Sequence, residues 1–205
     1  MILRIYHPEY LHFLKNDPLH MPDVTAQAAG QWIALCVDYA NQNNISIVIE
    51  GTWRNKDTVL AEASRANKLG RITHAVALSV PPLITRVSIL ERFYRDVDSG
   101  KQTRWTPPQA HENTVKILES NVKSIAFSTA IDRFSVLSRT ALLYDSETTK
   151  LPRRYGIEQW EGEFRRPITR MEAHRLSSTL TDIENAARRL GMETSDLIEI
   201  RRQLN

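Results

Sequence analysis

Residues 45–52 read ISIVIEGT, four Ile and Val residues around one serine, followed by an acid, a glycine and a threonine. A short apolar run that ends at turn residues is typical of a strand buried on both faces, as in a parallel sheet. The run therefore predicts a strand over residues 45–49, whose carboxyl end carries Glu50 and Thr52.

Helices and strands alternate on either side of this run. Further strands are expected at 72–80, 134–137 and 141–144. Apolar spacing and capping residues predict helices at about 23–39, 57–69, 83–96 and 107–121. This alternation predicts an α/β fold with a mostly parallel sheet flanked by helices.

Two of these helices carry more specific expectations. Asp23 is expected to cap the helix over 23–39, and Asp57 the helix that follows the strand at 45–49. The apolar face of the first helix is expected to consist of Trp32, Leu35, Cys36 and Tyr39.

The pattern changes after Leu151. Lysine is absent from that point on, no apolar run remains, and two helical periods are expected at 168–190 and 194–203. The sequence therefore predicts two parts, a core over 1–150 and a helical C-terminal tail over 151–205.

Composition excludes several classes of protein. At 205 residues, with 41% hydrophobic and 25% charged residues, the chain suits one folded domain or one domain with an appendage. A formal net charge of +3 is too small to indicate nucleic acid or a membrane surface as partner. The single cysteine excludes an internal disulfide, and no apolar run approaches the roughly 20 residues of a membrane span. We expect a cytoplasmic protein without a resident metal site.

Glu50 and Thr52 are the first candidates for a functional site. Ligands of open α/β sheets bind outside the carboxyl ends of the strands, where these residues are expected. An acid there can orient a hydroxyl, hold a metal ion through water, or accept a proton. The alternative is structural, with Glu50 capping the next helix or forming a surface ion pair.

Four arginines form the second candidate group. Arg86, Arg92 and Arg95 lie on one expected helix, and Arg104 lies on the loop after it. A guanidinium group can bind two phosphate oxygens at once, and it neutralises charge that develops during phosphoryl transfer. The alternative is a solvated helix face without a ligand.

A phosphate-binding loop motif is not found in the sequence. Phosphotransferases of this architecture carry Gly-x-x-x-x-Gly-Lys-Ser/Thr after the first strand. The one Gly-Lys pair, Gly100-Lys101, follows a helix and is succeeded by Gln102.

Five short blocks are informative when taken together. They are HPEY at 7–10, VIEGTWR at 48–54, VPP at 80–82, ERF at 91–93 and RWTPPQAH at 104–111. In order and spacing, over about residues 1–145, they resemble the zeta toxin family.

Zeta toxins are P-loop kinases of bacterial toxin–antitoxin systems that phosphorylate the 3′-hydroxyl of UDP-N-acetylglucosamine. The resemblance implies a P-loop-kinase-like fold, ATP and Mg²⁺ as cofactors, and an antitoxin protein as a possible partner. It implies that Glu50 and Thr52 bind the substrate, with Arg54 at the arginine of the same motif. It also implies that Arg92 and Arg104 contact the nucleotide phosphates and stabilise the transferring phosphoryl group.

The chain departs from the family's pattern at its beginning. The family's first strand, P-loop lysine and following helix precede the His-Pro dipeptide, which here lies at residues 7–8. The catalytic aspartate of the family falls on Met1, and a further substrate-side glutamate falls on Ala34. Because loss of a general base alone costs about 10²–10⁴-fold in rate, we expect little or no turnover.

The absent first strand of the family would lie between residues 45–50 and 72–80. Without it, either backbone groups stay unpaired or these two segments pair directly. We hypothesise that the natural protein is longer and that its gene encodes Gly-x-x-x-x-Gly-Lys-Ser/Thr upstream.

Three functional interpretations remain open from the sequence. The chain could be a zeta-type kinase with impaired activity, or a non-catalytic pseudokinase that binds a UDP-sugar or an antitoxin-like partner. The third interpretation is a remnant without function.

Overall fold

The computed structural model describes residues 2–17, 20–101, 103, 105–192 and 194–204. The chain divides into two compact units. The first, here named the helical unit, comprises Met1–Val48, Arg86–Pro108 and Arg170–Asn205. The second, the sheet unit, comprises Ile49–Thr85 and Gln109–Thr169.

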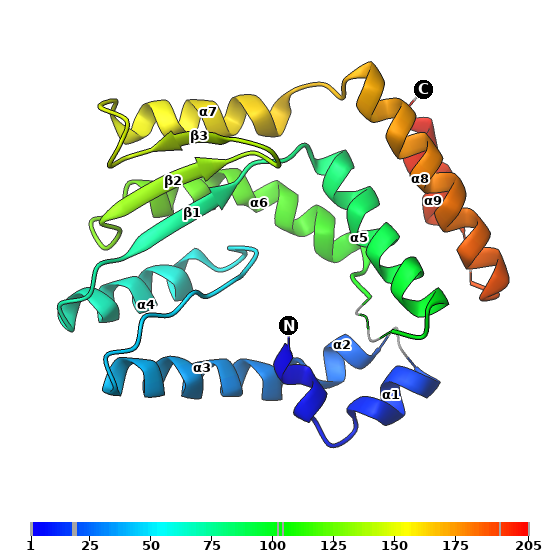
Figure 1. Ribbon diagram of the computed structural model, residues 1–205, viewed down its shortest axis with the longest axis horizontal. Helices are drawn as coiled ribbons and strands as arrows, with labels where there is room; N and C mark the ends of the chain where they lie inside the picture. Colours follow the sequence, from blue (N-terminus) through cyan, green and yellow to red (C-terminus); the bar gives the residue numbers. More distant parts are fainter. Residues whose placement is uncertain (1, 18–19, 102, 104, 193, 205) are drawn as a thin grey trace. The chain divides into compact units, whose positions relative to one another are not determined.

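Three strands form the sheet of the sheet unit (Figure 1). They are β1 His74–Leu78, β2 Arg133–Leu137 and β3 Leu142–Asp145, in the order β1-β2-β3. The strands expected at 72–80, 134–137 and 141–144 are thereby confirmed. β1 is parallel to β2, whereas β2 is antiparallel to β3. The sheet is therefore mixed rather than mostly parallel, because the short turn at 138–141 can join only antiparallel strands.

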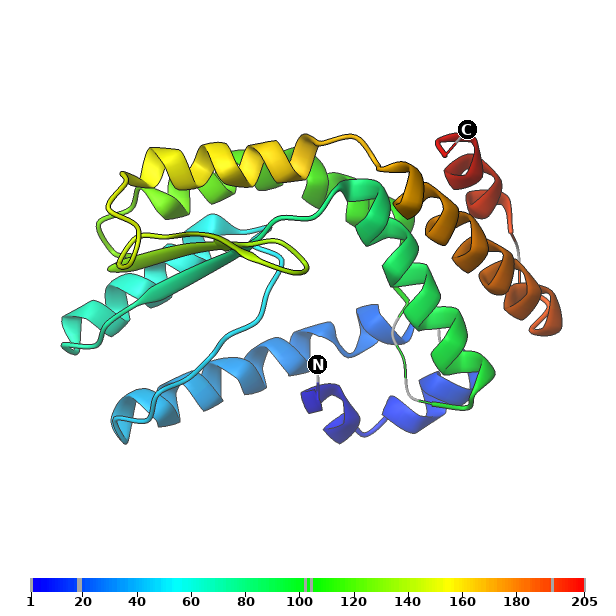
Figure 2. The same cartoon turned by 45° about the horizontal axis from the view of Figure 1, so that its top comes forward.

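Three helices of the sheet unit contribute to one hydrophobic core on the sheet. They are α4 Lys56–Lys68, α6 Pro108–Ala126 and α7 Arg153–Arg165. Figure 2 shows α6 and α7 side by side, and ion pairs from Lys123 to Glu161 and from Arg165 to Glu119 join them. The buried core includes Ala75, Ala77, Ile125, Phe134, Val136, Tyr144 and Trp160.

The opposite face of β1 is open. Side chains alternate between the two faces of a strand, so His74, Val76 and Leu78 point away from Ala75 and Ala77. Val76 is 42% exposed and Leu78 is 66% exposed. Because β1 is the first strand in the sheet order, its outer backbone edge pairs with no strand in the described part of the chain.

The prediction of a strand over residues 45–49 is wrong. Residues 45–50 form no strand, and the four apolar side chains among them are 39–93% exposed. A β-branched run favours extended backbone, but a strand requires a neighbour that pairs its N–H and C=O groups. Among the described residues β1 pairs with β2 alone, so the segments 45–50 and 72–80 do not pair directly either.

The helical unit contains helices from three separate parts of the chain. These are η1 Ile2–Tyr6, α1 Tyr10–Asn16, α2 Met21–Val24, α3 Ala26–Gln42, α8 Arg170–Arg189 and α9 Ser195–Arg202. α5, Pro82–Asp98, begins in the sheet unit and enters the helical unit at Arg86. In the part of the chain that is described, no helix is both long and apolar enough to cross a bilayer.

The helix expected over 23–39 differs from α3 in its start and in its buried face. Asp23 lies inside the short helix α2 and is not an N-cap of α3. Leu35 and Tyr39 are 64% and 62% exposed, and Cys36 is also exposed, so the expected apolar face is wrong. The buried side of α3 consists of Ala29, Val37 and Ala40. These smaller residues also recur at helical spacing. The prediction was based on the larger apolar side chains instead.

The C-terminal part of the chain holds three helices. α8 and α9 confirm the helices expected at 168–190 and 194–203. α7 was not expected, although its buried residues Gly156, Ile157, Trp160 and Phe164 recur at helical spacing. The division into domains at residue 150 stays a prediction.

Gly156 brings the backbone of α7 close to the sheet. A Cβ atom added there would lie 2.4 Å from Cδ1 of Tyr144, whose ring is buried on β3. Only glycine fits at this position without displacing the ring.

We predict that Gly156→Ala lowers the free energy of unfolding by about 1–3 kcal/mol, because the added methyl group overpacks the core. Urea denaturation measures this change. Gly162→Ala on the same helix is the matched control, because no atom lies within 4 Å of a Cβ added at that position. The control should keep or raise the stability, by up to about 1 kcal/mol. Equal losses in both variants would contradict the close contact.

Candidate functional site

The loop from Glu50 to Asn55 holds three of the expected site residues. Trp53 in this loop has a φ of +53°, in the left-handed region. A residue other than glycine in such a conformation costs on the order of 1–3 kcal/mol and persists only where the surroundings hold it. The loop backbone is therefore constrained by contacts that lie outside it.

Asn121 of α6 supplies one such constraint. Its Nδ2 donates hydrogen bonds to the backbone carbonyls of Trp53 at 2.8 Å and Arg54 at 3.2 Å. The Asn121 side chain is buried, and the ring of Trp53 packs against the hydrophobic core. A single amide thus holds two consecutive backbone carbonyls, that of the strained residue and that of the residue after it.

Asn55 fixes the other end of the loop. Its side-chain oxygen accepts hydrogen bonds from the backbone N–H groups of Asp57 at 3.0 Å and Thr58 at 3.1 Å. Asn55 is therefore the N-cap of α4, and the expectation that Asp57 caps this helix is wrong. Asp57 lies in the first turn instead, where a carboxylate interacts favourably with the helix dipole.

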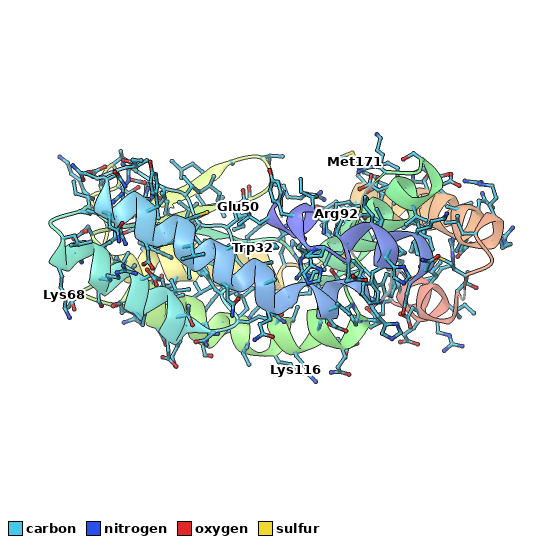
Figure 3. The ribbon with its side chains drawn as sticks, turned by 90° about the horizontal axis from the view of Figure 1, so that it is seen from below. Trp32, Glu50, Lys68, Arg92, Lys116 and Met171 are labelled. Carbon is cyan, nitrogen blue, oxygen red and sulfur yellow. The ribbon has the colours of Figure 1, made fainter. Side chains whose placement is uncertain are left out.

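The side chains of Glu50, Thr52 and Arg54 all lie at the surface of this constrained loop. Figure 3 labels Glu50. Within the described residues, none of these three side chains makes a hydrogen bond or an ion pair. Glu50 therefore neither caps α4 nor forms the surface ion pair that the sequence left open. The carboxylate of Glu50, the hydroxyl of Thr52 and the guanidinium of Arg54 are therefore available to a ligand. The backbone that carries them is constrained by hydrogen bonds.

The three arginines of the second group that the structure describes have different environments. Arg86 is 8% exposed and pairs with Asp196 of α9 at 3.3 Å. Arg95 pairs with its neighbour Asp96 at 3.4 Å. Arg92, labelled in Figure 3, is exposed, and its guanidinium makes no hydrogen bond or ion pair within the described chain. Of these three, Arg92 is the one whose charge is available to an anion.

Arg104 lies outside the described residues. The residue after it, Trp105, packs edge-on against Phe93 of α5, with ring centroids 4.8 Å apart. Arg92 and the loop around position 104 belong to the helical unit, whereas Glu50, Thr52 and Arg54 belong to the sheet unit. The structure thus groups Glu50, Thr52 and Arg54 on one loop of the sheet unit and places Arg92 in the helical unit.

A second polar cluster lies on the sheet. Ser135 donates a hydrogen bond of 2.5 Å to Asp145, and Nε2 of His74 lies 2.7 Å from the same serine oxygen. Burial would raise the pKa of Asp145, but hydrogen bonds from Ser135, Arg133 and two backbone N–H groups hold it well below its usual range. Because the serine proton points to Asp145, His74 must donate to Ser135 and cannot serve as its base. The cluster is a structural network of the sheet and not a nucleophile site.

Metal ligands do not gather in the described residues. No group of three or more His, Cys, Asp or Glu side chains is placed to hold an ion there.

Two residues of this site were missed by the sequence analysis. Asn121 holds the loop from a helix 68 residues away from Trp53, so spacing along the chain gives no signal for it. The left-handed conformation of Trp53 also has no sequence signal, since glycine and asparagine are the residues that usually indicate it.

Comparison with known proteins shows which chains this one is similar to. A family model described as Zeta toxin matches residues 2–149. The chain is 29% identical over 141 residues to Toxin zeta of Enterococcus hirae, which covers 68% of this chain and 48% of that protein. It is 28% identical over 141 residues to Toxin zeta of Streptococcus pyogenes, covering 68% of this chain and 47% of that one. The chain thus spans about half the length of the curated relatives it matches.

A solved structure shares the fold. It comes from the PezAT chromosomal toxin–antitoxin system of Streptococcus pneumoniae and superposes with a TM-score of 0.70 at 19% identity. The similarity covers 93% of this chain and 73% of that one.

We predict that Asn121→Asp loosens the loop and lowers the free energy of unfolding by about 1–3 kcal/mol. A carboxylate cannot donate to the carbonyls of Trp53 and Arg54, so both are left without their partner. Guanidinium denaturation measures the loss. Asn113→Asp is the control on the same helix, because Asn113 accepts a hydrogen bond from Gln109 that a carboxylate can also accept. A loss no larger at Asn121 than at Asn113 would refute the role of Asn121.

Proposed function

We propose that this chain, which belongs to the zeta toxin family, forms the acceptor site and the phosphate contacts of a kinase. The reaction is transfer of the γ-phosphate of ATP to the 3′-hydroxyl of UDP-N-acetylglucosamine. The observation that carries the proposal is the loop at 50–54. It presents three polar side chains that have no partner among the residues that the structure describes, at the positions that resemble the family's substrate-binding motif.

Glu50 suits the recognition of a sugar. An ionised carboxylate accepts hydrogen bonds from two neighbouring hydroxyl groups, and such charge-assisted bonds are stronger than neutral ones. Thr52 adds a hydroxyl that can donate or accept, and Arg54 adds a cation that can pair with the diphosphate of a UDP-sugar. The constraint by Asn121 supports this role, because a held backbone loses less entropy when the ligand binds.

Arg92 and Arg104 are proposed as the phosphate contacts. ATP, when bound, supplies the phosphoryl group, whose transfer spreads negative charge over its equatorial oxygens. Within the described residues the guanidinium of Arg92 has no partner, so it can neutralise this charge without first breaking an ion pair there. No step is assigned to Mg²⁺.

The rate of transfer by this chain is expected to be low or zero. Residues 1–205 contain no Gly-x-x-x-x-Gly-Lys-Ser/Thr motif, and the resemblance to the family aligns its catalytic aspartate with Met1. The alternative is therefore a non-catalytic pseudokinase that binds a UDP-sugar or an antitoxin-like partner. It is favoured by the same observation, because the loop at 50–54 needs no nucleotide site in order to bind a sugar.

We predict that Glu50→Gln weakens binding of UDP-N-acetylglucosamine about tenfold or more, since a hydrogen bond to a charged group is replaced by a neutral one. Isothermal titration calorimetry measures the affinity. Glu112→Gln removes the same charge from an exposed position on α6 and should leave the affinity unchanged. Parental affinity in the Glu50 variant would exclude the acceptor-site role.

We also predict that Arg104→Ala reduces phosphate transfer from radiolabelled ATP much more than it reduces binding of the UDP-sugar. The guanidinium acts on charge that develops during transfer, so the sugar should bind nearly as before. Arg95→Ala is the control, because Arg95 already pairs with Asp96. A defect confined to sugar binding would contradict the assignment, and a parent chain that binds the sugar without transfer would favour the pseudokinase.

A further inference from the structure

Arg86 is a buried cation that joins three segments of the helical unit. It lies near the start of α5, and its Nη2 pairs with Asp196 of α9 at 3.3 Å. Its Nη1 also donates a long hydrogen bond of 3.5 Å to the backbone carbonyl of Thr106. A buried guanidinium requires such partners, because its desolvation is costly when they are removed.

The loop after α5 is held at a second point. The ring of Trp105 packs against that of Phe93, which is fully buried on α5. The two anchored residues, Trp105 and Thr106, directly follow position 104, and Phe93 directly follows Arg92. The residues that neighbour both proposed phosphate contacts are therefore fixed to the same helix.

The C-terminal helices hold α5 near both of its ends. Asp196 of α9 reaches Arg86, and Arg189 of α8 binds Asp98 through two hydrogen bonds of 3.2 Å and 2.6 Å. Burial and the charge of Asp196 raise the pKa of Tyr94 on α5, and the charge of Arg86 opposes this rise.

α8 and α9 also bind each other, so the position of Asp196 is determined within the tail. Arg201 of α9 pairs with Glu184 of α8 at 3.0 Å and donates to Thr181 at 3.1 Å. The apolar side chains of Leu180 and Leu197 are buried in the same unit. This helix pair lies beyond residues 2–149, which the family model matches.

We propose that α8 and α9 position α5, which carries Arg92, and that Asp196 acts through Arg86 on the loop at Trp105 and Thr106. Arg86 and Asp196 are positioning residues, since they contact other side chains and the backbone and not the ligand. The consequence for phosphate binding rests on the function proposed above, whereas the effect on the loop does not.

The test uses the full chain with its four tryptophans labelled as 5-fluorotryptophan. Asp196→Asn removes the charge at a half-exposed position and preserves the side-chain shape, so the chain should still fold. The ¹⁹F resonance of Trp105, assigned from Trp105→Phe, should shift and become more sensitive to exchange of H₂O for D₂O. The other three resonances should stay unchanged.

Glu199→Gln is the matched control on α9, because Glu199 pairs only locally with Arg202. Asp196→Glu should restore most of the parental Trp105 signal, since it restores the charge. An unchanged Trp105 resonance in Asp196→Asn, or an equal change in Glu199→Gln, would overturn the proposal.

A second readout separates this proposal from the function on which it rests. Inorganic triphosphate is titrated and followed by ³¹P NMR, and Asp196→Asn and Arg92→Ala should each weaken its binding about tenfold. If Arg92→Ala weakens binding and Asp196→Asn does not, the positioning role is wrong and the phosphate contact stands. If Arg92→Ala has no effect, the phosphate contact is wrong, and the Trp105 resonance alone decides whether the tail holds the loop.

Discussion

The two hydrogen bonds from Asn121 to the Trp53 and Arg54 carbonyls link the candidate site to the core of the sheet unit. Asn121 is followed on α6 by Val122 and Ile125, which are fully buried against the sheet. The position of its amide is therefore determined by core packing and not by the loop that it holds. Because Trp53 has an unfavourable backbone conformation, the loop depends on this external support. The side chains of Glu50, Thr52 and Arg54 stay available for a ligand because Asn121 and Asn55, rather than Glu50, provide the structural hydrogen bonds.

The core of the sheet unit lies on one side of its sheet. α6 and α7 pack there, and the contact of Gly156 with Tyr144 sets how closely α7 approaches β3. The other face of β1 and the segment at 45–49 keep apolar side chains at the surface, with Val48 exposed by 93%. In the helical unit, ion pairs at both ends of α5 bring the C-terminal helices onto the helix that carries Arg92.

Much of the local structure could be predicted from the sequence, because helical periods and short β-branched runs are local signals. The strands near residues 76, 135 and 143 and the helices α4, α5, α6, α8 and α9 follow from them. The run at 45–49 carries the same signal as β1 but forms no strand, since pairing depends on a neighbour that no local pattern specifies. The prediction of the buried face of α3 was wrong for a similar reason, because burial depends on what packs against the helix. Glu50 and Arg92 could be selected as candidates from their residue types and spacing. Asn121 and Asp196 could not, since their roles arise from contacts distant in the sequence.

The most direct test of the central claim is a titration of the ¹⁵N-labelled chain with UDP-N-acetylglucosamine, followed by backbone amide NMR. The account predicts that the largest shifts fall on the amides of residues 50–55 and that they saturate with the ligand. Shifts confined to residues outside this loop, or none in a chain whose spectrum shows that it is folded, would contradict the claim that the loop is an acceptor site.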